Sequence, residues 1–424
     1  MPLSTRNLKK LELDPLVSKF GNKAAGWKGR LMAKSGRLVL LKSGLSSLAI
    51  YMMTIHKLPA WVLKRLTQIC HSWLWNGDTV CNGGNCRVAW KLICRPKHLG
   101  GLGVLGPLKF GRALRLRWLW LAWKHPDRPW VKSPLPCCNE EKELFAMATE
   151  ITVGDGRATN FWQDRWLEGL CPKWIAPSLF RIAARKNRSV WEAIKDDKWL
   201  HDLSRGLRDD MLDELYALAS RLEHVRLHEG QYDSIIWRFS QDGAYTARSA
   251  YRLQFEGAVQ MAGYKLVWRG WAPGKCRFLV WMIMLDKILT ADALLRRGWD
   301  NYYFRPLCQR NLETPSHIFV ECPWSRNIWN YNATLVDMPS LCPASWKMDL
   351  KYSTWFNSTC AQTAKEKKKG PISLVHLITW EIWRERNRRV FQRELMSMEG
   401  FRCRISEEIR LSNCAGAGIP FDPG

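Results

Sequence analysis

The chain has 424 residues, of which 46% are hydrophobic and 25% charged, a composition that is typical of globular proteins and excludes a disordered or fibrous one. Lys and Arg number 65 against 39 Asp and Glu, so the formal net charge of +26 favours an acidic partner, most simply nucleic acid. The most apolar stretch, residues 44–55, contains two serines and is bordered by lysines, which excludes a membrane-spanning helix there. The N-terminal residues lack the apolar block of a signal peptide, so we expect an intracellular protein of the nucleus or cytoplasm.

The positive charge is concentrated in the first third of the chain. Residues 1–130 hold 23 Lys and Arg against 4 Asp and Glu, whereas residues 131–260 hold 18 against 20 and residues 261–424 hold 24 against 15. Solvent-exposed faces normally mix both signs of charge, and residues 1–130 have too few acidic residues for that. We therefore expect this region to bind a polyanion through its phosphates. The alternative is an ordinary solvated surface.

Two residue types stand out in number. The 14 cysteines are irregularly spaced, which predicts free thiols and not a disulfide framework. The 25 tryptophans predict large aromatic cores, while a few of them could stack on nucleic-acid bases.

Two helices are predicted in the basic region. The first covers residues 59–75, which begin with a proline, precede an Asn-Gly pair and carry apolar side chains every three or four positions. The second covers residues 108–123 and places Arg112 and Arg115 one turn apart, close enough to contact successive phosphates. Between the two helices, pairs of glycines border residues 86–90, which we expect to form a short strand.

Composition divides the chain into four regions. The predicted helices and the one short strand indicate a mainly α fold with minor short strands (α+β). A proline-rich junction at residues 126–136 ends the basic region. A last helix is predicted over residues 371–391, with apolar residues on one face and arginines near its end. The expected regions are residues 1–130 (basic), 131–240 (mixed charge), 241–335 (aromatic-rich) and 336–424 (an irregular segment, the terminal basic helix and a tail).

The sequence contains no catalytic constellation that we recognise. A polymerase needs clustered carboxylates that hold two metal ions. The adjacent acidic pairs, Asp196-Asp197 and Asp209-Asp210, lie in amphipathic stretches of mixed charge, so we expect them on solvated helix surfaces. A glycine-rich loop followed by Lys and Ser or Thr, which would bind a nucleotide phosphate, is not found. We therefore expect no enzymatic activity and no small-molecule substrate.

Cys308, His317 and Cys322 have a spacing typical of a metal site. Thiolates and imidazoles are preferred Zn²⁺ ligands, but a closed structural site has four of them and this spacing supplies three. The position that would complete a Cys-x2-Cys pair is Arg305, whose permanently charged side chain cannot be a ligand. The alternative is two buried thiols beside a hydrogen-bonded histidine.

Residues 305–329, which read RPLCQRNLETPSHIFVECPWSRNIW, closely resemble the zinc-binding module behind the reverse transcriptase of plant non-LTR (LINE-type) retrotransposons. Residues 242–251 (DGAYTARSAY) look like the start of that module, and residues 281–290 and 294–298 look like its helical middle. The resemblance implies a small helical zinc-binding domain in this part of the chain.

The resemblance extends to both sides of the module. Segments between residues 2 and 103 are similar to the thumb-like connection directly after the polymerase palm, and residues 380–391 are similar to the terminal segment of grass copies. In all, the similarity covers most of residues 1–413. The family's fingers and palm, with their metal-binding carboxylates, and the ribonuclease H domain of some relatives have no counterpart in this sequence. The resemblance therefore implies a truncated, non-catalytic fragment of a reverse transcriptase.

The resemblance also implies a zinc site at Cys308, His317 and Cys322, with Arg305 in place of the fourth ligand. We expect zinc to be bound weakly or lost, because one thiolate is missing and a guanidinium stands beside the site. In the parent enzyme the thumb holds template and primer by their backbone, so we expect sequence-tolerant binding to RNA or DNA. The residues expected to make these contacts are Lys28, Arg30, Lys34, Arg37, Lys64, Arg65, Arg112, Arg115 and Arg117. The alternative hypothesis is a host-adopted, Trp-rich scaffold that binds proteins and has no nucleic-acid role.

Overall fold

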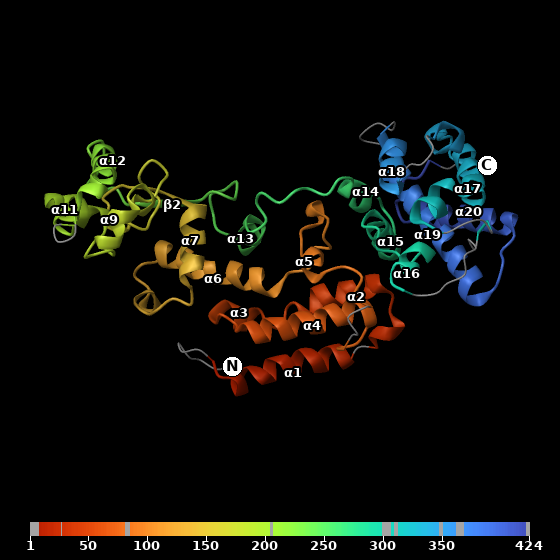
Figure 1. Cartoon of the computed structure of the whole chain (residues 1–424), viewed down its shortest axis with the longest axis horizontal. Helices are drawn as coiled ribbons and strands as arrows, with labels where there is room; N and C mark the ends of the chain where they lie inside the picture. The colour runs from red at the N-terminus through yellow and green to blue at the C-terminus, as the bar shows by residue number, and fades with distance from the viewer. Residues whose placement is uncertain are drawn as a thin grey trace. The chain divides into compact units, whose positions relative to one another are not determined.

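The computed structural model describes residues 8–26, 28–80, 85–203, 207–298, 307–308, 313–346, 351–361 and 369–420. The described residues are mainly α-helical and contain one small two-stranded sheet, so the predicted fold class is confirmed (Figure 1). The chain divides into two compact units. Unit 1 comprises residues 1–18, 46–66 and 105–257, and unit 2 comprises residues 19–45, 67–104 and 258–424.

Most helices of the two units are labelled in Figure 1. Those of unit 1 are α3 (Ile50–Ile55), α6 (Pro107–Lys124), α7 (Asn139–Ala148), α8 (Pro172–Ile175), α9 (Pro177–Ile182), α10 (Val190–Ile194), α11 (Lys198–His201), α12 (Leu212–Leu222) and α13 (Ala247–Leu253). Those of unit 2 are α2 (Lys34–Leu40), α5 (Trp90–Ile93), α14 (Tyr264–Trp268), α15 (Gly274–Met284), α16 (Ala291–Leu295), α17 (Pro323–Leu335), α18 (Tyr352–Ala361), α19 (Lys369–Asn387) and α20 (Met398–Cys414). Helices α1 (Lys10–Gly26) and α4 (Ala60–Asn76) contain residues of both units.

Helix α6 is the central helix of unit 1 and packs against α3 and α13. Pro107 stands in its first turn, where a missing N–H costs no hydrogen bond. Gly111 is buried within α6 close to α3, and an added Cβ would lie 3.6 Å from Cβ of Met53. The Tyr251 hydroxyl of α13 accepts a hydrogen bond from the Gly106 N–H, just before α6, at 3.1 Å. These contacts fix the start of α6 against its two neighbours.

The sheet of unit 1 consists of β1 (Thr149–Thr152) and β2 (Ser234–Trp237), which pair antiparallel with Thr149 opposite Trp237. The core of the unit contains the fully buried aromatic side chains of Phe161, Trp162 and Trp237. The glycine-containing turn after β1 is held by Asp233. Its carboxylate accepts hydrogen bonds from the N–H groups of Gly154, Gly156, Ala158 and Thr159.

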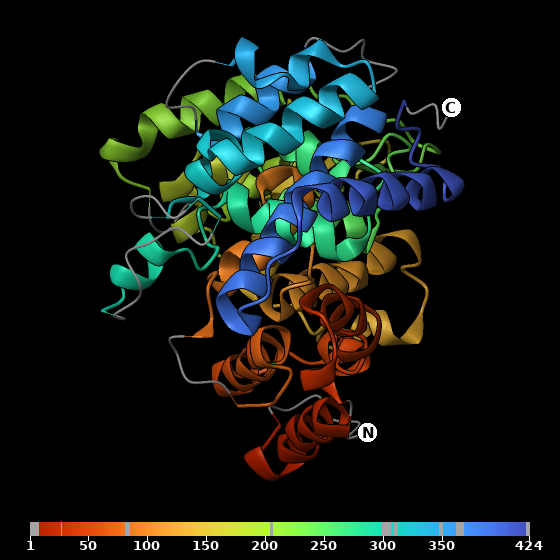
Figure 2. The same ribbon diagram turned by 90° about the vertical axis from the view of Figure 1, so that its right-hand side faces the viewer.

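Helices α15 and α19 are the most buried helices of unit 2 and pack against each other. Helix α15 also packs against α2, and its Trp281 indole N–H donates to the Gly100 carbonyl at 2.8 Å. Helix α19 also contacts α18 and α20, which lie beside it in blue shades in Figure 2. The long α19 therefore runs through the interior of the unit, and most of its residues are buried.

Three predicted helices are confirmed and one predicted strand is wrong. Residues 59–75, 108–123 and 371–391 correspond to α4, α6 and α19, the last of which continues as a π-helical turn over Arg388–Gln392. Residues 86–90 are not a strand, and α5 begins at Trp90. The backbone there has no described strand beside it; instead, the Val88 carbonyl lies 2.9 Å from Nε2 of His71.

The tryptophans and cysteines are placed largely as the sequence predicts. Six tryptophans are among the largest fully buried side chains, namely Trp73, Trp162, Trp237, Trp281, Trp329 and Trp355. All the described cysteines are free thiols.

No described helix combines the length and hydropathy that crossing a bilayer requires.

Candidate metal centre and nucleic-acid interface

Cys308, His317 and Cys322 come together in unit 2. Cys308 lies in a turn, His317 begins the π-helical segment His317–Glu321, and Cys322 directly precedes α17. The metal-binding atoms of the three side chains all lie within 4.8 Å of one another, and Sγ of Cys308 is 3.3 Å from Nε2 of His317. Among the described residues this is the one group of three His, Cys, Asp or Glu side chains at such distances.

The donor set fits zinc in chemistry and in size. Two sulfurs and one imidazole nitrogen are ligands that Zn²⁺ prefers, and their separation leaves room for one ion between them. Burial raises the pKa of the Cys322 thiol to about 11, and the neighbouring Cys308 adds to the shift. Without a metal the thiol is therefore neutral near pH 7, and an ion that binds there has to displace its proton.

The sequence places Arg305 at the fourth ligand position. Arg305 lies outside the described residues. Cys276, a buried thiol of α15, does not belong to the described cluster.

Glu321 is a candidate functional residue that the sequence analysis missed. Its Oε2 lies 3.7 Å from Nδ1 of His317, one helical turn away. Metal-binding histidines commonly face a carboxylate with their second nitrogen, which directs the lone pair of the first nitrogen to the metal. The signal was available as an acidic residue four positions after the histidine.

Glu313, four positions before His317, forms a buried ion pair with α19. The Arg386 guanidinium donates to Oε2 of Glu313 at 2.9 Å and to Oε1 at 2.6 Å, and both side chains are almost fully buried. Glu313 also accepts a hydrogen bond from the Ala291 N–H, at the start of α16, at 3.2 Å. The Glu313 carboxylate thus connects the segment before His317 to α19 and α16.

A second arginine, in the π-helical turn that follows α19, contacts the backbone beside Cys308. Arg389 donates to the carbonyl of Leu307, the residue before Cys308, at 3.2 Å. Its guanidinium also pairs with Glu385 at 2.9 Å and lies over the Trp324 ring. We call Arg386 and Arg389 the arginine clamp. The arginines at the end of the predicted basic helix are therefore engaged within unit 2.

The residues expected to bind nucleic acid fall into three groups. Lys28, Arg30, Lys64, Arg65 and Arg117 are exposed, and Arg30 also forms an exposed ion pair with Asp78 at 2.6 Å. Lys34 and Arg112 are half-buried, and Arg112 pairs with Glu140 at 2.6 Å. Arg37 and Arg115 are buried. The structure divides the nine residues between the units, with the first four in chain order in unit 2 and the other five in unit 1.

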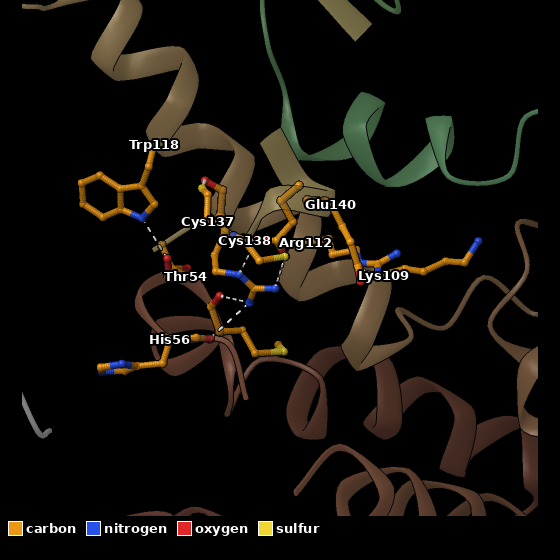
Figure 3. Close-up of polar contacts among 12 residues, drawn as sticks. Thr54, His56, Lys109, Arg112, Trp118, Cys137, Cys138 and Glu140 are labelled. Atoms are coloured by element: carbon orange, nitrogen blue, oxygen red, sulfur yellow. Dashed lines mark hydrogen bonds and ion pairs between the residues drawn. The ribbon is translucent and has the colours of Figure 1, made fainter. Parts of the chain in front are cut away.

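Arg115 has a structural role that the sequence did not reveal. Its guanidinium pairs with the buried Glu141 carboxylate and donates to the carbonyls of Met53 and His56 at 3.0 and 3.2 Å. These carbonyls end α3, where backbone acceptors lack helical partners. Figure 3 shows this region, with the Trp118 indole N–H donating to Thr54 beside it. The expectation that Arg115 contacts phosphate does not fit this burial.

Arg37 acts in the same way in unit 2. Its guanidinium donates to the carbonyl of Trp75, near the end of α4, at 2.8 Å and to the carbonyl of Gly29 at 2.8 Å. Burial lowers the pKa of Arg37. Both buried arginines thus stabilise helix ends, and the expectation that Arg37 contacts phosphate is corrected likewise.

The acidic pairs lie where the sequence predicts. Asp196 and Asp197 are exposed in a short helical turn, and Asp209 and Asp210 are exposed just before α12.

Comparison with known proteins places the metal cluster inside a recognised module. Residues 245–329 match the family described as zinc-binding in reverse transcriptase. Over 362 residues the chain is 25% identical to a putative ribonuclease H protein of Arabidopsis thaliana, an alignment that covers 78% of this chain and 57% of the relative. The chain therefore spans little more than half the length of that relative. The two likenesses support a retrotransposon-type protein.

The name of the Arabidopsis relative conflicts with the expectation that a ribonuclease H domain is missing here. At 25% identity the likeness does not assign that activity to this chain. The matched module contains the metal cluster but ends before α19, which carries Arg386 of the clamp.

Proposed function

We propose that the chain is the nucleic-acid-binding part of a retroelement reverse transcriptase of the plant non-LTR (LINE) type, and that it carries a weakened zinc module. The observation that supports this most directly is the convergence of Cys308, His317 and Cys322 within residues 245–329, which match the zinc-binding family.

The zinc module has a structural role in this proposal. Cys308, His317 and Cys322 would hold the ion, with Glu321 beside His317. When bound, zinc supplies a crosslink between Cys308, His317 and the start of α17 and no chemical step. The sequence places Arg305 at the fourth ligand position, so the affinity for zinc is lower than in a four-ligand site.

We expect the exposed basic residues of each unit to contact nucleic acid. Lys64 and Arg65 are adjacent on α4, Arg117 is exposed on α6, and Lys28 and Arg30 precede α2. Exposed cations of this kind bind phosphates of any sequence by releasing counterions. The expected ligand is therefore the backbone of RNA or DNA.

The test is a salt titration of binding to an RNA and to a duplex DNA of unrelated sequence. If five phosphates are contacted, log K should fall with log salt at a slope of roughly −4. Replacing Lys64, Arg65 and Arg117 by Gln should reduce that slope by about 2 to 3, whereas replacing the exposed acidic Asp209 and Asp210 by Asn should not reduce it. A flat salt response, together with binding to a protein partner, would favour the scaffold alternative.

A further inference from the structure

Unit 2 contains a cavity of about 270 Å³, and neither Cys308, His317 nor Cys322 lines it. Lys34 and Ser35 of α2, Lys275 of α15, and Trp380 and Trp383 of α19 line it. Arg87, from the segment before α5, completes the polar lining. The packing of α15 against both α2 and α19 holds these walls together. The cavity is large enough for one small group, such as a single unit of a longer chain whose remainder stays outside it.

The charged residues that are described in the lining of the cavity are all cations. Lys34, Arg87 and Lys275 line it, and no carboxylate is among its described lining residues. Burial, then the charge of Arg87, lowers the pKa of Lys34 to about 8, and burial also lowers the pKa of Arg87 to about 10. The charge of Lys275 also acts on the Glu381 carboxylate, which is paired with Arg404 at 3.0 Å. An anion in the cavity would relieve this repulsion.

The aromatic wall supplies the second half of a nucleotide site. The Lys275 ammonium lies 5.3 Å from the centre of the Trp380 ring, so cation and indole share the same side of the cavity. Trp383 adds a second indole on which a base could stack.

We propose that this cavity binds one nucleotide unit of a single-stranded nucleic acid, with its phosphate at Lys34, Arg87 and Lys275 and its base against Trp380 or Trp383. The inference rests on the proposed function and assigns to it a specific site. Lys34, half-buried in contrast to Lys64 and Arg65, is therefore a phosphate-binding residue of a cavity and not of an open surface.

The experiment measures binding of the full chain to an oligo(dT) of about ten nucleotides over a range of salt concentrations. Lys34→Met, Arg87→Met and Lys275→Met should each reduce the salt slope by about 0.7 and weaken binding roughly fivefold at about 0.1 M salt. Lys91→Met and Lys287→Met are the matched controls, because they remove one exposed charge each from the same unit. The controls should change the slope by much less.

Two further measurements identify the ligand. An oligonucleotide with 5-iodouracil, irradiated on the protein, should crosslink to the tryptic peptide that ends at Arg384 and contains both Trp380 and Trp383. Thymidine monophosphate and inorganic phosphate should compete with the oligonucleotide only weakly. Competition by free nucleotide as strong as by the strand would overturn the assignment to a strand.

The outcomes separate this inference from the proposed function. If the unaltered chain binds RNA and DNA with a steep salt slope but the three cavity variants behave as their controls, only the cavity assignment fails. If the unaltered chain binds no nucleic acid, the proposed function fails as well. Thermal unfolding distinguishes lost contacts from misfolding, since removing an unpaired cation from the cavity should leave the melting temperature equal or higher.

Discussion

At the scale of single residues, burial decides what each arginine does. Arg37 and Arg115 come from the same basic region as Lys64 and Arg65, yet both lie inside the protein and donate to backbone carbonyls. The sequence predicts which residues are cationic, because charge is a property of the side chain alone. It does not predict which cations are buried, because the partner of Arg115, Glu141, lies 26 positions further along the chain.

The Arg115–Glu141 pair gives a stability prediction for unit 1. Arg115→Met should lower the free energy of unfolding by about 3–5 kcal/mol, because it leaves the Glu141 carboxylate buried without a counter-charge. Urea unfolding followed by circular dichroism measures this change. Arg117→Met, two positions along the same helix and exposed, should stay within about 0.5 kcal/mol. Equal effects of the two variants would show that Arg115 is not buried as described.

Asp164 gives a prediction for pH dependence. Burial raises its pKa to about 6, an effect that the 2.7 Å hydrogen bond from the Asn160 N–H opposes and the nearby charges of Lys173 and Asp233 modify. Because the folded pKa exceeds that of the unfolded chain, the protonated form stabilises the fold at low pH, and this contribution is lost as the pH rises through about 6.

Asp164→Asn should therefore become more stable than the unaltered protein as the pH rises from about 4 to about 7, by on the order of 2–3 kcal/mol. Urea midpoints at several pH values measure the difference between the two proteins. Asp197→Asn, at an exposed position, is the control and should show no comparable trend. A difference that is constant across this range would contradict the raised pKa.

At the scale of elements, the spacing of apolar residues predicted the helices, whereas the contacts between distant segments could not be predicted. Helices α4 and α6 follow from local apolar spacing, and Val62, Leu66 and Ile69 are buried in α4 as that spacing predicts. The strand expected at residues 86–90 failed because a strand needs a partner, and local sequence does not identify one. The three metal-site residues were predicted by their spacing, but the arginine clamp was not, since Arg386 lies 73 positions from Glu313.

The arginine clamp leads to the prediction that α19 stabilises the metal site. Arg386→Met should lower the free energy of unfolding of unit 2 by about 3–5 kcal/mol, because Glu313 remains buried without its partner. It should also weaken uptake of Zn²⁺ or Co²⁺, because Glu313, four positions before the ligand His317, loses its partner. Arg384→Met removes a more exposed guanidinium 3.6 Å from Glu381 and is the matched control. Metal uptake that is unchanged in Arg386→Met would separate α19 from the site.

At the scale of the whole molecule, the four regions expected from composition differ from the two compact units of the structure. The sequence regions follow changes in charge along the chain, whereas each compact unit combines segments that are far apart in sequence. The basic residues 1–130 are shared between both units for this reason. Composition records only the order of residues, and the return of later segments onto earlier ones depends on packing that no local pattern specifies.

The two units lead to a final prediction about zinc and unfolding. Each unit has its own buried side chains, so calorimetry should show two transitions and not one.

The unaltered chain should hold less than one zinc per molecule by elemental analysis, because the sequence supplies Arg305 where a closed site has its fourth ligand. Arg305→Cys should restore a full equivalent and raise the unfolding temperature of unit 2 alone, since metal binding adds to the folding free energy of the unit that holds it. Cys403→Ser, which alters an exposed thiol of the same unit, is the control and should change neither quantity. A full equivalent of tightly bound zinc in the unaltered chain would mean that another residue completes the site.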